Sequence, residues 1–270
     1  MQSTPFFDNA SPNPRFTVHT SAHQHQATSN LVVENLSVKY RAIEALSQVS
    51  FSVQPGRLVG IFGPNGAGKS TLIKAMLGLI PAINGKVLYQ GKPLVDQLDQ
   101  VAYVPQRSQI DWSYPVTVWD VVMMGRTKKT GWFQRYSSIS RRLTTQALDR
   151  VGMIEFRDRA ISDLSGGQQQ RVFLARALAQ QAEVFCFDEP FVGIDQKTQT
   201  IMFDVFKELT RENKLILVVN HDLGESITHF DDLILLNKSL VASGSRQQVL
   251  TQENLQQAYG GKVVFFSDAA

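Results

Sequence analysis

Short apolar runs alternate with helically spaced apolar positions along most of the chain. Three β-rich runs lead through a glycine-rich loop into a helix that Pro81 ends; we expect strands at 31–40, 49–53 and 58–62 and the helix at 69–79. After residue 165 we expect helices at 168–179 and 198–211 and strands at 184–187, 215–220 and 233–237. These later strands are almost wholly apolar, which is typical of a parallel sheet covered on both faces. The pattern therefore predicts an α/β fold on a mainly parallel sheet.

The stretch from about 107 to 165 has a different character. Apolar residues recur there at helical spacing, first as Val118, Val121 and Val122 and later from Leu143 onward, and Gly152 is a suitable helix stop. We therefore expect a helical insert at about 107–165, within one domain that spans residues 31–262.

The first thirty residues differ from the rest of the chain. They contain three prolines, only two charged side chains, and the histidines His19, His23 and His25. Such a segment buries too little apolar surface to offset the entropy lost on ordering, so residues 1–30 are expected to form a disordered polar tail. The histidines could bind a transition metal or could simply be solvated. Residues 263–270 are expected to form a short C-terminal end.

Composition narrows the class of protein. The chain has 270 residues, of which 43% are hydrophobic and 19% charged, with a formal net charge of +3. That hydrophobic share is normal for a globular protein. No apolar run approaches the roughly 18 to 20 residues of a membrane-spanning helix, and the first thirty residues lack the apolar region of a signal peptide, so we expect a cytosolic protein. The basic residues are scattered, so a pI near 9.0 does not indicate a nucleic-acid partner.

A phosphate-binding loop is predicted between the strand at 58–62 and the helix after it. The segment fits G-x-x-x-x-G-K-[ST] and comprises Gly63, Pro64, Asn65, Gly66, Ala67, Gly68, Lys69 and Ser70, with Thr71 next. Glycines let backbone N–H groups approach phosphate oxygens, and the helix N-terminus adds positive potential. Lys69 adds a charge for the β- and γ-phosphates, and the Ser70 hydroxyl is suited to ligate Mg²⁺. A glycine turn that merely caps a helix would not explain this Lys-Ser pair, so ATP and Mg²⁺ are the expected cofactors.

Two carboxylates follow the apolar strand at 184–187. Asp188 can hold Mg²⁺, and Glu189 can polarise a water for in-line attack on the γ-phosphate. Paired carboxylates at a strand end are common on protein surfaces, but the intervening helices and strands allow this pair to return to the sheet edge of Lys69. Cys186, in the same strand, is expected to be a small buried hydrophobe, and as the single cysteine it excludes an intrachain disulfide.

The segment Leu164-Ser-Gly-Gly-Gln-Gln-Gln-Arg171 resembles the signature motif of ATP-binding cassette (ABC) ATPases. Ser165, Gly166, Gly167 and Gln168 open a predicted helix whose N–H groups and dipole favour an anion, although Ser165 could also be a simple N-cap. With the phosphate loop and the carboxylates, the resemblance covers about residues 31–250. It implies the P-loop NTPase fold of ABC ATPases: a mainly parallel RecA-like core sheet, an N-terminal antiparallel β subdomain and a helical insert.

The resemblance implies roles for four further residues. Tyr40 resembles the aromatic that stacks on adenine, and Gln106 resembles the glutamine that reaches Mg²⁺ and the catalytic centre. His221 resembles the switch histidine on the γ-phosphate. Asp195 resembles the aspartate that crosses the dimer interface, although Ile194 stands where the family usually has leucine.

The same resemblance implies how the residues work together. Two copies would face head to tail, so that each ATP lies between the phosphate loop of one copy and Ser165-Gly-Gly of the other. Glu189, His221 and Gln106 would be the catalytic residues, while Ser70, Gln106 and Asp188 would hold Mg²⁺ with the nucleotide. The γ-phosphate would close the dimer and its hydrolysis would open it.

Two classes of function fit such an ATPase. One is the energy subunit of a membrane transporter; the other is a soluble cassette ATPase in DNA repair, chromosome structure or translation. The soluble proteins would be expected to have a long coiled coil, paired cassettes or zinc modules, whereas this chain has 96 positions between Lys69 and Ser165 and one cassette. The transporter interpretation implies an integral membrane permease, indirectly a substrate-binding protein, and a peripheral position on the cytoplasmic face of the cell (inner) membrane.

The segment after Gln106 narrows the resemblance. The stretch 107–126 with Trp112-Ser-Tyr-Pro115, together with 131–133, 189–195 and 254–261, resembles ATPases of manganese, zinc and chelated-iron importers, especially the manganese branch. Manganese is therefore the expected cargo, with zinc or chelated iron as the alternative. Trp112 and Tyr114 could form a surface pocket for a permease helix, or they could pack inside the helical insert.

Overall fold

The computed structural model describes residues 30–130 and 135–260. The predicted tail with its histidines, the segment 131–133 and the C-terminal end at 263–270 lie outside these ranges, apart from Asn30. In the described ranges, no helix is both long enough and apolar enough to cross a membrane.

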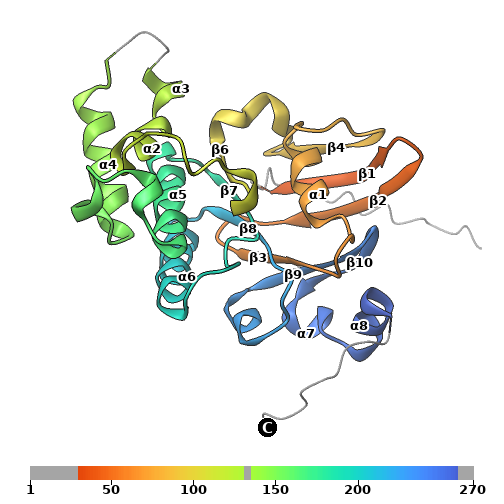
Figure 1. Cartoon of the computed structure of the whole chain (residues 1–270). Helices are drawn as coiled ribbons and strands as arrows, with labels where there is room; N and C mark the ends of the chain where they lie inside the picture. The colour runs from red at the N-terminus through yellow and green to blue at the C-terminus, as the bar shows by residue number, and fades with distance from the viewer. Residues whose placement is uncertain (1–29, 131–134, 261–270) are drawn as a thin grey trace, which may run out of the picture.

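Two sheets form the framework of the molecule (Figure 1). The smaller sheet is antiparallel and has the order β2-β1-β4-β5, with β1 at Leu31–Tyr40, β2 at Ile43–Val53, β4 at Asn84–Tyr89 and β5 at Lys92–Pro93. The larger sheet has the order β10-β9-β3-β8-β7-β6, with β3 at Leu58–Phe62, β6 at Val101–Val104, β7 at Val184–Asp188, β8 at Leu215–Val219, β9 at Asp232–Asn237 and β10 at Ser239–Ser245. Its strands are parallel except β10, so the predicted mainly parallel core sheet and antiparallel β subdomain are confirmed.

Helices cover the larger sheet on both sides. The α-helices are α1 (Lys69–Met76), α2 (Val118–Met124), α3 (Thr127–Thr130), α4 (Ser138–Arg150), α5 (Gly166–Gln180), α6 (Gln196–Arg211), α7 (Arg246–Val249) and α8 (Gln252–Tyr259). Short 3₁₀ helices fill several connections: η1 (Leu94–Gln100), η2 (Arg107–Gln109), η3 (Ile154–Phe156), η4 (Ile161–Asp163) and η5 (Glu225–His229). In Figure 1, α2 and α4 pack against α5 at the side away from the smaller sheet.

Alternate residues of β7 show how both sheet faces are buried. Phe185 and Phe187 belong to a cluster that includes side chains of α2, α4, α5 and α6. Val184 and Cys186 belong to a second cluster, which α1 and the smaller sheet complete. Because β3, β7, β8 and β9 each contribute to both clusters, their sequences are mainly apolar, which explains why these four strands were predictable; β6 and β10 of the same sheet were not predicted.

Some predicted boundaries are wrong. The helix expected at 69–79 ends at Met76, because Gly78 adopts a left-handed conformation (φ 68°) that a helix cannot continue through. The strand expected at 49–53 is longer and begins at Ile43. The described part of 107–165 consists of helices, turns and one bridge between Thr117 and Ala160, which agrees with the predicted helical insert.

Candidate functional site

The phosphate loop joins the end of β3 to the start of α1. Gly63 has φ 152°, and a Cβ atom there would lie 2.0 Å from the carbonyl oxygen of Leu236 in β9. Gly68 has φ 94°, and a Cβ atom there would lie 2.6 Å from a methyl group of Leu46. Gly66 is exposed, and a Cβ atom there would have no neighbouring atom within 4 Å. Two glycines thus hold the loop against the fold, and the third leaves its backbone open to a ligand.

Lys69 turns back over the loop. It is only 6% exposed, and its Nζ donates to the carbonyl oxygens of Gly63 at 2.8 Å and Pro64 at 3.0 Å. Burial lowers the pKa of Lys69, while the charges of Glu189 and Asp188 act in the opposite direction. The ammonium group is therefore held at the loop by carbonyl dipoles that a phosphate can replace.

Ser70 and Asp188 meet at the carboxyl end of β7. The Ser70 hydroxyl donates to Asp188 Oδ1 at 2.8 Å. Asp188 is 1% exposed, and its Oδ2 has no hydrogen-bond partner in the described part of the chain. Burial raises the pKa of Asp188, against the opposing effect of the Ser70 hydrogen bond. A buried carboxylate oxygen without a partner beside a hydroxyl suits a hard cation with oxygen ligands, so these residues fit Mg²⁺.

Glu189 and Gln106 form a second pair beside the first. The Gln106 side chain donates from Nε2 to Glu189 Oε2 at 2.7 Å. Glu189 adopts a left-handed backbone conformation (φ 51°) and its N–H donates to the carbonyl oxygen of Val219 in β8. Because β6, β7 and β8 are adjacent parallel strands, their carboxyl ends bring Gln106, Asp188 and Glu189 to one sheet edge.

His221 follows β8 at the same edge, between β3 and β7 in the sheet order. The side chain of Asn220, which is 4% exposed, accepts the backbone N–H groups of His221 at 2.9 Å and Asp222 at 3.3 Å. The His221 side chain is exposed. Asn220 thus fixes the backbone of this loop, a role that the sequence pattern did not indicate, while the imidazole faces solvent.

The signature segment lies at the start of α5, whereas the phosphate loop lies at the start of α1. Ser165 caps the helix through a reciprocal pair of hydrogen bonds with Gln168. A Cβ atom at Gly167 would lie 2.7 Å from the Thr198 hydroxyl and 3.2 Å from Asp195 Oδ2. Asp195 caps α6 by accepting the Thr198 N–H at 2.8 Å. The structure therefore brings the signature segment to Asp195, and no hydrogen bond among the described residues joins either to the phosphate loop.

The aromatic residues that the sequence singled out differ in their exposure to solvent. Tyr40 ends β1 and is 48% exposed, without a contact to the phosphate loop in the described interactions. Trp112 packs on Phe173 of α5, with ring centroids 5.0 Å apart, whereas Tyr114 is 61% exposed. Of the two alternatives for this pair, Trp112 therefore follows the packing one and Tyr114 remains available at the surface. Cys186 is fully buried, as expected, and burial raises its pKa to about 12.

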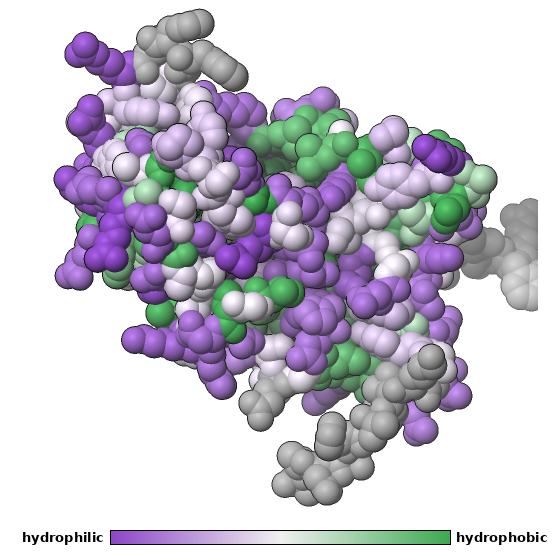
Figure 2. Space-filling view, in the orientation of Figure 1, coloured by the Kyte–Doolittle hydropathy of each residue, from purple (hydrophilic) through white to green (hydrophobic). Residues whose placement is uncertain are grey.

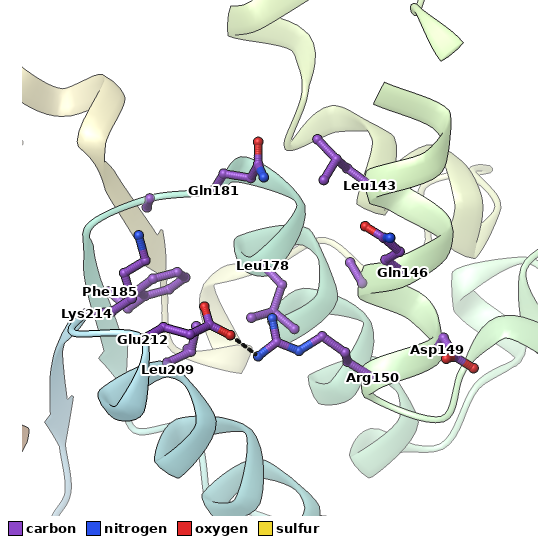
Figure 3. A pocket seen from close by; sticks show the side chains of 12 residues that line it. Leu143, Gln146, Asp149, Arg150, Leu178, Gln181, Phe185, Leu209, Glu212 and Lys214 are labelled. Carbon is purple, nitrogen blue, oxygen red and sulfur yellow. Dashed lines mark hydrogen bonds and ion pairs between the residues drawn. The ribbon is translucent and has the colours of Figure 1, made fainter. Parts of the chain in front are cut away.

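A cavity of about 400 Å³ lies elsewhere, between α4, α5 and α6 (Figure 3). Its apolar floor includes Leu178, Phe185 and Leu209, and it shares no lining residue with the phosphate loop. Arg150 spans its edge and forms ion pairs of 3.0 Å with Glu208 and 3.2 Å with Glu212. Lys214, the other cation that lines the cavity, pairs with Glu183. Both cations are already paired with carboxylates, so the cavity does not add an anion site.

Several known proteins are similar in sequence to this chain over most of its length. The family model described as "ABC transporter" matches residues 46–192. A Cyanophora paradoxa protein named "Probable ABC transporter ATP-binding protein in ycf23-apcF intergenic region" is 49% identical over 85% of this chain and 94% of its own length. The manganese transport system ATP-binding protein MntB of Halalkalibacterium halodurans is 48% identical, over 87% and 94%. The zinc transport system ATP-binding protein TroB of Treponema pallidum is 45% identical, over 86% and 87%.

Solved structures agree with the sequence relatives. A structure described as an inward-facing conformation of a metal-chelate type ABC transporter superposes with a TM-score of 0.76. It is 29% identical and covers 86% of this chain, which in turn covers 90% of that chain. The similarity therefore extends over most of the described residues in both sequence and shape.

Proposed function

The chain belongs to the ABC transporter family as an ATP-binding, ATP-hydrolysing subunit, and from that premise we propose that it energises the import of manganese through a separate membrane permease. The observation that carries the catalytic part is the Ser70–Asp188 pair, with one buried carboxylate oxygen left without a partner among the described residues. It lies beside Lys69 and the Gln106–Glu189 pair at one sheet edge, where a nucleotide phosphate would meet all of these groups.

Each of these side chains has a defined task in the proposed reaction. Lys69 binds the β- and γ-phosphates, and Ser70, Asp188 and Gln106 provide oxygen ligands for Mg²⁺. When bound, Mg²⁺ would neutralise the charge that develops on the phosphate oxygens. Glu189 accepts a proton from the attacking water. Gln106 helps to orient the Glu189 carboxylate through the hydrogen bond that it donates to Oε2.

We propose that the remaining residues act on nucleotide shared between two copies of the chain. His221 would contact the γ-phosphate from the end of β8, and Tyr40 would stack on adenine with its exposed ring. Ser165 to Gln168, at the N-terminus of α5, would bind the γ-phosphate held by the other copy. Asp195 contacts the same turn and would lie at the interface between the copies.

The permease is proposed to dock on an exposed apolar patch made by the segment that follows α1 and by η1. The patch consists of Leu79, Ile83, Val95 and Leu98, which are 37% to 62% exposed. Figure 2 shows hydrophobic side chains gathered at this upper edge of the molecule. A cavity of about 410 Å³, lined mainly by apolar residues and including Val95, opens beside the patch. An apolar helix of a permease would fit such a surface and hold the ATPase at the cytoplasmic face of the inner membrane.

Manganese is the proposed cargo because relatives at 44% to 48% identity are named as manganese transport subunits. A zinc transport subunit at 45% identity supports zinc as the second candidate. In this proposal the ATPase does not contact the ion. A substrate-binding protein delivers the ion to the permease, through which it enters the cell. A soluble cassette ATPase outside transport has no support among these relatives.

One experiment tests the ATPase arrangement. Glu189→Gln keeps the shape of the side chain but removes the base, so ATP should bind while hydrolysis falls by about two to four orders of magnitude. The variant should form an ATP-dependent dimer on size-exclusion chromatography, with Lys69→Ala in the same background as a control that stays monomeric. A Glu189→Gln protein that remains monomeric with ATP and Mg²⁺ contradicts the head-to-tail arrangement.

A second experiment tests transport and cargo. Co-purification of the full chain with membrane proteins, compared with a Val95→Glu variant, should show loss of the permease from the variant. Uptake of manganese, zinc and iron should then be measured in cells lacking the protein, with and without the wild-type chain. Loss of zinc uptake with normal manganese uptake would overturn the choice of cargo.

A further inference from the structure

Arg107, the residue after Gln106, lies beside the first turn of α5. If a Cβ atom were built on Gly166, it would lie 3.3 Å from the guanidinium carbon of Arg107 and 3.6 Å from its Nε. The Nη2 group of Arg107 donates to Gln169 Oε1 at 2.8 Å. The guanidinium is therefore next to the signature turn, in a space that a side chain at Gly166 would enter.

The surrounding residues fix the guanidinium in this place. Trp112 Nε1 donates to the carbonyl oxygen of Arg107 at 3.0 Å, and the guanidinium carbon lies 5.5 Å from the centroid of the Trp112 ring. Trp112 itself packs on Phe173 of α5. Gln169 is 3% exposed and also donates to the carbonyl oxygen of Ile161. Both partners of the arginine side chain are thus held by the helix whose first turn it contacts.

The charge of Arg107 is not matched by a carboxylate. None of the ion pairs among the described residues includes Arg107, and its Nε is buried without a hydrogen-bond partner. The N-terminus of α5 carries a positive partial charge of its own, and the Asp195 carboxylate near this turn already accepts two hydrogen bonds from Thr198. A cation beside the helix N-terminus is therefore unfavourable unless a further anion binds there. A fixed guanidinium with an unused N–H at a helix N-terminus therefore points to an anionic ligand.

We propose that Arg107 is an anion-binding residue of the shared ATP site, adding a fixed positive charge to the signature turn that receives the γ-phosphate held by the second copy. This inference rests on the proposed head-to-tail function. Two consecutive residues would then serve both ATP sites of a dimer, because Gln106, the residue before η2, reaches Glu189 at the site of its own copy. Arg107, one residue later, reaches the signature turn that faces the other site.

The test uses the full chain with Glu189→Gln, which stops hydrolysis and isolates the binding steps. ATP-dependent dimerisation is measured by sedimentation velocity over a series of protein and salt concentrations. Adding Arg107→Gln should weaken dimerisation by on the order of 10- to 100-fold, the range for a lost charge-assisted hydrogen bond, and should flatten its salt dependence. Arg107→Lys should recover part of both effects. Binding of a fluorescent ATP analogue to the monomer should stay unchanged, because the phosphate loop is intact.

A matched control separates charge from packing. Gln169→Ala removes the contact of Nη2 but keeps the guanidinium charge, so it should weaken dimerisation less than Arg107→Gln and leave the salt dependence unchanged. If Gln169→Ala and Arg107→Gln have equal effects with the same salt dependence, Arg107 is only a packing element and the inference is wrong. Equal dimerisation with and without Arg107→Gln also overturns it. If Glu189→Gln alone stays monomeric with ATP, the head-to-tail function itself fails.

Discussion

Replacing Asp188 by asparagine separates the metal-binding role of this carboxylate from its effect on the fold. Asp188 is buried, with one oxygen on the Ser70 hydroxyl at 2.8 Å and the other without a partner among the described residues. Burial is the largest influence on the pKa of Asp188 and raises it, so the folded protein disfavours the ionised form. Asparagine keeps the shape and an acceptor for Ser70 but carries no charge.

The expected magnitude follows from the unpartnered oxygen. An asparagine amide at this position would also lack a partner, which costs about 1 to 3 kcal/mol, but a buried charged group without a partner costs more, so removing the charge leaves a net gain. Loss of the attraction to Lys69 and Lys74 offsets part of this gain, since both cations favour the ionised carboxylate. We therefore expect Asp188→Asn to raise the free energy of unfolding by about 1 kcal/mol without nucleotide or metal, which in a chain of this size raises Tm by roughly 2 to 4 °C.

The pH dependence has a defined sign. Because the folded-state pKa of Asp188 lies above its unfolded value, the wild-type protein loses stability as pH rises from below the unfolded pKa through the folded one. The variant has no such loss. The stability difference should therefore be absent in acid, where both states of the wild type are protonated, and complete above the folded-state pKa.

Differential scanning calorimetry in EDTA, from acid to neutral pH, measures this difference. With Mg²⁺ and ADP the order should reverse, because a ligand stabilises the folded state according to its affinity and asparagine weakens the metal site. Asp195→Asn is the control: hydrogen bonds from Thr198 are the main influence lowering the Asp195 pKa, so removing its charge should not raise Tm. A lower Tm for Asp188→Asn in EDTA at neutral pH refutes the reasoning.

Three further outcomes follow from the packing. Gly63→Ala places Cβ 2.0 Å from a carbonyl oxygen of β9 and should cost about 3 kcal/mol or more in urea unfolding, whereas Gly66→Ala, with open space around it, should cost about 1 kcal/mol; equal losses contradict this. Arg150→Ala breaks partly exposed ion pairs to Glu208 of α6 and to Glu212, the residue that follows this helix, and should lower the free energy of unfolding by at most about 1 kcal/mol, so a larger loss argues against a surface contribution. Cys186 should resist a thiol reagent in the native protein and react after denaturation; rapid native reaction contradicts its burial.

The core strands were predictable because their burial is two-sided. The strands β3, β7 and β8 are buried at every position, so a continuous apolar run marks each of them in the sequence. By contrast, β4 and β10 contain exposed and polar positions and were not predicted. Their place is set by pairing with β1 and β9, which are far away in the sequence or separated by a turn whose backbone at Lys238 is left-handed. Local pattern does not encode such pairing.

The candidate site likewise contains residues that the sequence could predict and residues that it could not. The phosphate loop could be recognised because each glycine and the Lys69-Ser70 pair have fixed positions relative to a strand and a helix. Arg107 could not be recognised as part of the site, because its role depends on Gln169 and Gly166, which a different helix brings next to it. The same is true of Trp112, whose burial depends on Phe173. The roles of Arg107 and Trp112 depend on contacts between distant segments, and a single sequence contains no signal for such contacts.

The unpaired atoms of the site explain how a nucleotide could be bound by groups that are already occupied. Lys69, Ser70 and Gln106 each have a protein partner in the structure, so binding a nucleotide there exchanges one set of hydrogen bonds for another with little net gain. Asp188 Oδ2 and Arg107 Nε have none among the described residues. The first is anionic and suits a cation, and the second is cationic and suits a phosphate. Because satisfying a buried group of this kind recovers its full desolvation cost, these two atoms are where binding free energy can accumulate, one on each side of a shared ATP site.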